Sequence, residues 1–331
     1  MMDTRMIFRV LPLAIIVATA CQDTSGPIGL EQLNTSKVLA DYSAMDAVRQ
    51  SAGWQGFRMA APQMAAKIGF VRSDVAIHNV PLISETNRGK TFVYDGARHE
   101  WVIDPARTGA PANGVRFITY EPKGAEPDPT KPIGHADLID LGNATAGIAL
   151  RLVVVEGTLT ILDYQTSLEG SEGSGHVIVE GFVQNTRDKL AFDIDVRGQN
   201  SGGVERADIT FELGIATREF HVTGDVEATK QNGVESGAVD LRVRHGSSSF
   251  AVDIENTRGT LAGDIDLNGS PFALVSGPAQ QPVFKKPGGG DIGGGEALVL
   301  YRIFDVSEDV FDLFEDLIDP IDELVLWAWI L

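Results

Sequence analysis

Hydrophobic and polar residues alternate with a period of two along most of the chain between residues 91 and 276. In the stretch 189–198, KLAFDIDVRG, the residues Leu190, Phe192 and Ile194 alternate with small or charged ones. The same alternation recurs in ADITFELG, AVDLRVRHG, FAVDIEN and LAGDIDLNG. A period of two with one apolar and one charged face predicts antiparallel strands, buried on one side and wet on the other. We expect roughly twelve such strands, joined mostly by short turns such as QNG, RHGSS, NTRG and NGS.

A sheet of this length has to cover its apolar face. We therefore predict a mainly β fold: a large antiparallel meander sheet, curved or closed into a barrel-like or sandwich-like body, with an N-terminal helix and C-terminal amphipathic helices. Near the start of the sheet, TFVYDGARHEWVID predicts a hairpin in which Asp95-Gly96 forms the connection, with the glycine at positive φ. The segment 121–132, EPKGAEPDPTKP, is polar and rich in proline, so we expect a loop there.

Helical periodicity is confined to the two ends of the predicted fold. We predict a β-rich domain over residues 36–276 that begins with a helix over residues 36–53. Ser36 is the candidate N-cap of this helix, and Gly53 is its candidate C-terminal stop. Residues 277–296 are rich in glycine and proline and predict a linker. Residues 297–331 predict a helical segment in which an apolar stripe faces a run of acidic residues.

The chain ends in LVLWAWIL, which is wholly apolar. Two interpretations of this segment are open. In the first, it packs over an open edge or end of the sheet and completes the core. In the second, Trp327 and Trp329 contact a membrane or a partner protein, because contiguous exposed apolar residues usually mark an interaction site.

The N-terminus has the pattern of an export signal. Arg5 and Arg9 flank the start of an apolar run over residues 10–20, which is too short to span a bilayer as a helix. The run ends in Ala-Thr-Ala, directly before Cys21. Cys21 is the only cysteine in the 331 residues, so burial and not a disulfide framework has to stabilise the fold.

Ala-Thr-Ala-Cys resembles the lipobox of bacterial lipoproteins. The resemblance covers residues 1–21 and implies that residues 1–20 are a lipoprotein signal peptide, that Cys21 is lipidated, and that residues 21–35 form a lipidated tether. Gln22, in place of an aspartate after the cysteine, implies sorting to the outer membrane. The alternatives are an ordinary secretory signal with a stray cysteine near the cut, and an uncleaved membrane anchor.

The formal net charge of −19 narrows the choice of partners. Nucleic acids require positive patches on the proteins that bind them, so an acidic chain of this kind is not expected to bind them. The same charge disfavours docking of the protein surface on anionic lipid. The expected membrane contact is therefore the N-terminal lipid anchor, and the remaining candidate partners are a lipid ligand or another protein.

The sequence contains no catalytic constellation that we recognise, so we do not expect an enzyme. His135 lies near Asp137 and Asp140 in GHADLID, which would form a site if a third group arrived from elsewhere, but a histidine in a solvent-facing loop is the simpler interpretation. Gly288, Gly290 and Gly293 satisfy G-x-G-x-x-G but follow a linker instead of a strand, so no cofactor is expected. No pair of histidines has the spacing of a metal site.

Four aspartates lie at the solvent-facing positions of the predicted strands. If these strands are neighbours, the aspartates are weak candidates for a calcium-binding ladder. They are Asp193, Asp240, Asp253 and Asp264. Arginines lie among them in the sequence, and pairing of opposite charges across strands is the ordinary use of such residues. A solvated face is therefore the alternative to a divalent cation site.

These observations predict a lipid-anchored protein of the cell envelope, membrane-bound and non-enzymatic, which binds a lipid or other hydrophobic ligand in a cavity of the curved sheet. In architecture alone, and without a shared motif, a curved sheet closed by helices resembles the lipoprotein carrier and acceptor proteins of the bacterial envelope, which hold acyl chains in an apolar cavity. The alternative is a structural or surface-interaction lipoprotein with a filled core and no ligand. An envelope enzyme without visible motifs and an outer-membrane barrel are the remaining possibilities, although few tyrosines are present to form an aromatic girdle.

Overall fold

The computed structural model describes residues 51–68, 83–142, 147–171, 173–297, 299–300 and 303. Its one long helix is α3 (Ala52–Ile68). The strands are β1 (Lys90–Asp95), β2 (Glu100–Ile103), β3 (Gly114–Lys123), β4 (Glu126–Asp140), β5 (Gly147–Glu156), β6 (Leu159–Ser171), β7 (Ser174–Gln184), β8 (Lys189–Ser201), β9 (Val204–Ile215), β10 (Phe220–Gln231), β11 (Val234–His245), β12 (Ser248–Thr257), β13 (Thr260–Leu267), β14 (Ser270–Pro278) and β15 (Val283–Lys285). A short 3-10 turn, Ala216–Arg218, connects β9 to β10.

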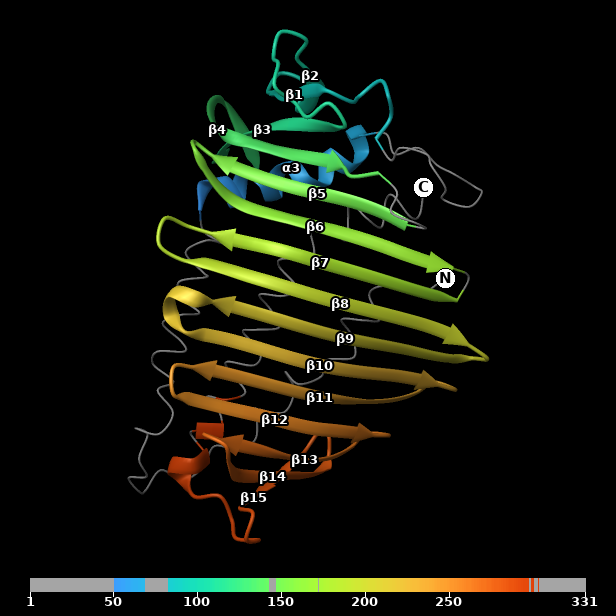
Figure 1. The fold of residues 1–331 in the computed structure, drawn as a ribbon, viewed down its shortest axis with the longest axis vertical. Coiled ribbons are helices and arrows are strands. Elements are labelled where there is room, and N and C mark those ends of the chain that lie inside the picture. Colours follow the sequence, from blue (N-terminus) through green and yellow to red (C-terminus); the bar gives the residue numbers. More distant parts are fainter. Residues whose placement is uncertain are drawn as a thin grey trace. The chain divides into compact units, whose positions relative to one another are not determined.

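The protein is mainly β, as the alternating pattern predicts, and its strands form a meander of fifteen. From β3 to β15 each strand is hydrogen-bonded to its neighbours in chain order (Figure 1). At the edge of the sheet opposite β15, β3 is followed by β1 and then by β2. The described pairs are antiparallel except β1 with β3, which run parallel over three residue pairs. The predicted antiparallel meander is therefore confirmed, while a barrel-like or sandwich-like body stays a prediction.

The chain divides into two compact units. In the described part of the chain, the first unit contains α3, β1 to β6 and residues 177–191, and the second contains residues 171 and 173–176 together with the residues from Phe192 onward. Among the described residues, no helix is both long and apolar enough to cross a membrane.

Helix α3 begins where the sequence predicts that a helix ends. Gly53, the expected C-terminal stop, lies in the first turn of α3, so this prediction is wrong. Ser51 caps the helix, because its Oγ accepts a hydrogen bond of 3.2 Å from the backbone N–H of Trp54. The buried residues Trp54, Phe57 and Ala60 recur at helical spacing and face β3, β4 and β5. Residues 36–50 of the predicted helix lie outside the described residues.

The predicted hairpin over β1 and β2 is confirmed, with Phe92 opposite Ile103 and Asp95 opposite Glu100. Its left-handed residue, however, is His99, with a φ of 54°, and not Gly96. Asp95 holds the turn, because its Oδ1 accepts the backbone N–H groups of Ala97 and Arg98.

The predicted loop over residues 121–132 is wrong, because the prolines lie in β3 and β4, on either side of a turn at Gly124. Strand β4 pairs with β5 only from Gly134 onward, so its proline-rich half bonds to β3 alone. Proline lacks the N–H that a second neighbouring strand would need, and it is tolerated at such an edge and at the register shifts that β3 and β4 show there.

The second unit has the most regular part of the sheet. Strand β10 pairs with β9 and with β11 along its whole length without a register shift, which places apolar side chains on one face. Of the side chains predicted to form that face in β9, β11, β12 and β13, Val239 is only half-buried, and the others are buried: Ile209, Phe211, Leu213, Leu241, Val243, Val252, Ile254, Leu261, Ile265 and Leu267.

Two details near the end of the sheet differ from the sequence prediction. The stretch 277–296, expected to be a linker throughout, contains the end of β14 and the three-residue strand β15. Residues 294–297, 299–300 and 303 are helical, and Val299, Leu300 and Ile303 are buried. The predicted signal peptide, Cys21, the predicted tether and the terminal segment with Trp327 and Trp329 lie outside the described residues.

Candidate functional site

Two of the buried charged residues of the first unit, Asp137 and Asp140, lie on β4, and a third, Asp188, lies between β7 and β8. Arg116 on β3 lies opposite Asp137 on β4. Its Nε and Nη2 each donate a hydrogen bond of 2.7 Å to one oxygen of the Asp137 carboxylate. His135 lies two residues away on the same face, with its Nε2 3.8 Å from Asp137 Oδ2. Arg116 is thus the third group that the sequence alone could not name.

His135 is not the solvent-facing loop histidine that the sequence suggests. It lies within β4 and its side chain is 24% exposed. Burial lowers the pKa of His135, the Asp137 carboxylate opposes that effect, and the Arg116 guanidinium adds to it. The hydrogen bonds from Arg116 to Asp137 in turn raise the pKa of the guanidinium. The cluster therefore places an ion pair beside an imidazole whose pKa is lowered by burial.

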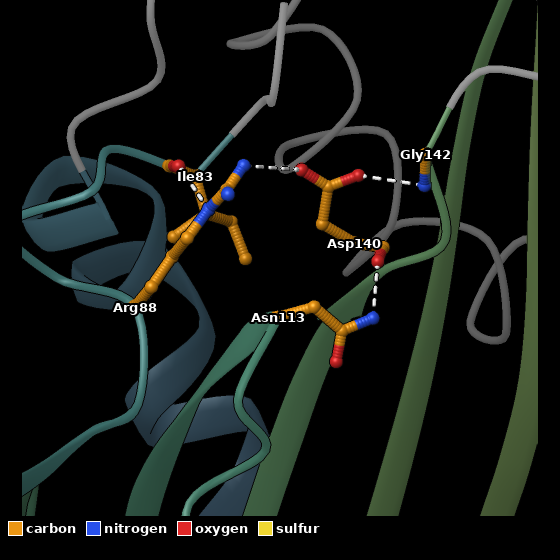
Figure 2. Close-up of polar contacts among 5 residues, drawn as sticks. All are labelled: Ile83, Arg88, Asn113, Asp140 and Gly142. Carbon is orange, nitrogen blue, oxygen red and sulfur yellow. Dashed lines mark hydrogen bonds and ion pairs between the residues drawn. The ribbon is translucent and has the colours of Figure 1, made fainter.

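Asp140, the other carboxylate of the GHADLID segment, belongs to a separate set of contacts (Figure 2). Residues 137 and 140 differ by an odd number of positions, so they lie on opposite faces of β4. Asp140 Oδ2 lies 3.5 Å from Arg88 Nη2, and Oδ1 accepts the backbone N–H of Gly142 at 2.9 Å. Arg88 also donates to the Ile83 carbonyl, and Asn113 donates to the Asp140 carbonyl. These bonds tie the segment before β1 to the end of β4.

Neither set has the composition of a catalytic site. Both oxygens of Asp137 are occupied by Arg116, and the contacts of Asp140 described above include an arginine and backbone groups. The contacts found for Arg116, Asp137 and His135 include no serine, cysteine or threonine that His135 could activate. The arrangement does what buried ion pairs commonly do: it fixes the alignment of two strands and one loop.

The wet face of the second unit carries the most unusual arrangement of charge. Asp225 lies opposite Asp240, Asp240 opposite Asp253, and Asp253 opposite Asp264. Four carboxylates thus form one row across β10, β11, β12 and β13, which we call the aspartate row. Like charges directly opposite each other on neighbouring strands are destabilising. The sequence correctly named three members, but it missed Asp225 and included Asp193, which lies on β8.

The aspartate row is only partly neutralised. Asp240 accepts hydrogen bonds from Nε and Nη2 of Arg242, at 3.1 and 2.9 Å. The Arg242 guanidinium also attracts the carboxylates of Asp253 and Asp225, and this attraction contributes less to its raised pKa than the bonds to Asp240 do. Burial, followed by repulsion from Asp253 and Asp266, raises the pKa of Asp264. In the described part of the chain, no group of three or more histidine, cysteine, aspartate or glutamate residues has the geometry of a metal site.

The glycine motif has a different setting from the one expected. The sequence predicts that Gly288, Gly290 and Gly293 follow a linker and not a strand. This prediction is wrong, because the short strand β15 precedes them. However, β15 is a three-residue antiparallel strand, and the following turn is closed by a bond from Lys286 N–H to the Gly290 carbonyl. A dinucleotide site of this kind requires two parallel strands connected by a helix, and this segment does not form such a unit.

No family model, curated protein or solved structure matches this chain. The function therefore has to be argued from the residues themselves.

Proposed function

We propose that the protein is a lipid-anchored, non-enzymatic protein of the cell envelope, which acts through its surface and has a filled interior where α3 covers the sheet. The anchor rests on the lipobox-like sequence before Cys21 and the polar stretch after it. The proposal of a non-enzymatic role is supported by the two buried sets around Asp137 and Asp140, whose charged groups bond to each other and to backbone groups of strands and a loop.

The filled interior is supported by the contact of α3 with the sheet, the observation that carries this proposal. A Cβ atom added at Gly56 would lie 2.8 Å from the Tyr120 carbonyl oxygen. One added at Gly53 would lie 2.6 Å from Glu156 Oε2 and 2.7 Å from the side chain of Ile161. At these two positions the helix backbone lies against the backbone of β3 and against the Glu156 and Ile161 side chains of β5 and β6, which leaves no room for an acyl chain there.

The Glu156 carboxylate strengthens this contact. Its Oε2 accepts a hydrogen bond of 2.9 Å from the Gly53 N–H, one of the N–H groups that has no partner inside the helix. A negative charge at a helix N-terminus is also favourable because of the helix dipole. The first turn of α3 is thus bonded to the sheet and does not act as a lid over a cavity.

A hydrophobic-ligand carrier is the second candidate function. It is favoured by the apolar face of β9 to β13, where aligned residues such as Phe211, Leu241 and Val252 present a continuous apolar surface. A carrier built on this face would retain lipid during purification, whereas a surface-acting protein with a filled interior would not.

The anchor is tested by comparing wild-type protein with Cys21→Ala after separation of membrane and soluble fractions. We expect wild type in the outer-membrane fraction and the variant either unprocessed or released. Far-ultraviolet circular dichroism of both proteins controls for folding, since Cys21 is not expected to contribute to the core. A Cys21→Ala protein that is processed and retained like wild type would contradict the anchor.

A further inference from the structure

Three Asn-Gly pairs occur in the sequence, at Asn113-Gly114, Asn232-Gly233 and Asn268-Gly269. In such a pair the backbone nitrogen of the glycine can attack the side-chain carbonyl carbon of the asparagine. The new C–N bond closes a succinimide ring, the carboxamide C–N bond breaks, and the amide nitrogen leaves as ammonia. Water then opens the ring to give aspartate or isoaspartate. Glycine favours the attack because no side chain shields its nitrogen.

Two of the three pairs are restrained by hydrogen bonds. The Asn113 side chain donates to the Asp140 carbonyl at 2.6 Å, and the Gly114 N–H donates to the Pro111 carbonyl. Gly114 is also buried, and a Cβ there would lie 2.3 Å from a backbone oxygen, so the nitrogen cannot move toward the side chain. Asn268 Oδ1 accepts the Ser249 N–H at 2.8 Å, which turns the carboxamide toward β12 and away from Gly269.

Asn232 has no such restraint. It lies with Gly233 in the exposed two-residue turn between β10 and β11, at a φ of 53°. Among the described residues, no hydrogen bond holds its carboxamide. A Cβ added at Gly233 or at Gly269 would meet nothing within 4 Å, so what separates these two turns is the hydrogen bond that the Asn268 carboxamide accepts.

From these differences we infer that Asn232 is the site of spontaneous deamidation in the folded protein. The product adds one carboxylate to an already acidic unit. In the isoaspartate form the backbone passes through the former side chain, which lengthens a turn that fits two residues. The pairing of Gln231 with Val234 is then lost first, so chemical damage to the regular sheet of the second unit begins at this turn.

The test is a time course of the purified full-length protein at mildly alkaline pH, followed by digestion and peptide mass spectrometry. Conversion raises the peptide mass by about 1 Da, because an amide NH2 becomes a hydroxyl. We expect the peptide with Asn232 to convert several-fold faster than those with Asn113 and Asn268. In urea-unfolded protein the three rates should converge, because the restraints are lost.

An Asn232→Gln variant is the matched control, since glutamine needs a larger ring and reacts far more slowly. It should show no early mass increase in this peptide while Asn113 and Asn268 behave as in wild type. The inference is overturned if Asn268 or Asn113 converts as fast as Asn232 in folded wild type. It is equally overturned if Asn232 stays intact in the folded protein while the unfolded protein converts at all three positions.

Discussion

Single ion pairs in the first unit differ in burial while sharing the same geometry. Arg116 with Asp137 and Arg151 with Asp163 each form two hydrogen bonds between guanidinium and carboxylate. The arginine side chain is 21% exposed in the first pair and 45% exposed in the second. Comparing the two pairs therefore shows how burial changes the contribution of an ion pair to the free energy of unfolding.

Replacing Asp137 by Asn should destabilise the protein by about 3 kcal/mol, because Arg116 then remains half-buried without a counter-charge. The same change at Asp163 should cost less than about 1 kcal/mol, because water can solvate Arg151. Urea unfolding of the two variants measures the difference. Equal losses of unfolding free energy would show that burial does not distinguish the pairs.

His135 makes the stability depend on pH in a definite direction. Burial lowers its pKa in the folded protein below the ordinary value of 6.5, so the unfolded chain binds more protons once the pH falls below 6.5. Stability should therefore decrease as the pH falls from 6.5 toward the lowered pKa. Below that pKa this contribution becomes constant.

The measurement is the free energy of unfolding at a series of pH values for wild type and His135→Gln. Glutamine does not titrate, so the variant should lose less stability than wild type on acidification. Asp137 and Arg116, the charged groups facing His135, are present in both proteins. Identical pH dependences would mean that His135 is solvated like an ordinary surface histidine.

At the scale of elements, two-residue turns and strict alternation made the second unit predictable. The pair Asn232-Gly233 sets the register of β10 and β11, and counting back from it places Asp225 opposite Asp240. Asp225 could therefore have been found from the sequence by register, although its own local pattern did not single it out. Asp193 could not be excluded in this way, since its position depends on which strands are neighbours.

Helix α3 was missed because its glycines have a tertiary purpose. Trp54, Phe57 and Ala60 have helical spacing, but Gly53 indicated a stop, and Gly56 also has low helix propensity. The need for glycine arises from the approach of β3, β5 and β6, which local sequence does not encode. The prolines of β4 misled in the same way, because a strand paired on one side only tolerates them.

Replacing Gly56 by Ala tests this contact. Helix propensity alone would make the change stabilising by about 1 kcal/mol. We expect the opposite, a loss of about 1 to 3 kcal/mol, because the added methyl meets the Tyr120 carbonyl and the side chain of Ile133. Thermal unfolding measures it, with Arg58→Ala on the exposed side of α3 as the control. A more stable Gly56→Ala protein would mean that the helix lies off the sheet.

The aspartate row predicts a stabilising substitution. Asp253 lies between Asp240 and Asp264, so replacing it by Asn removes two like-charge pairs at once. Stability should rise by about 0.5 kcal/mol at low salt, and the gain should shrink as salt screens the repulsion. Asp208→Asn is the control: Asp208 also lies opposite a carboxylate, Glu227, but Arg206 pairs with both, so this variant should show no gain. Destabilisation by Asp253→Asn would contradict the row's repulsive character.

At the scale of the whole molecule, the account combines an anchor inferred from residues 1–21 with a sheet whose charges serve structure. The mainly β meander followed from periodicity. The function did not follow, because apart from the lipobox-like segment we recognise no motif that indicates a reaction or a ligand, and the charged residues that the structure brings together pair with one another or face solvent. What separates a surface-acting protein from a carrier is whether the molecule holds a ligand.

Native mass spectrometry of the protein purified from membranes in mild detergent tests this most directly. The account predicts a single species whose mass is that of residues 21–331 plus covalent acyl groups on Cys21, with no further mass released on activation. A species that releases a bound lipid would contradict the filled interior. A species that retains residues 1–20, or lacks acyl groups on Cys21, would contradict the lipid anchor.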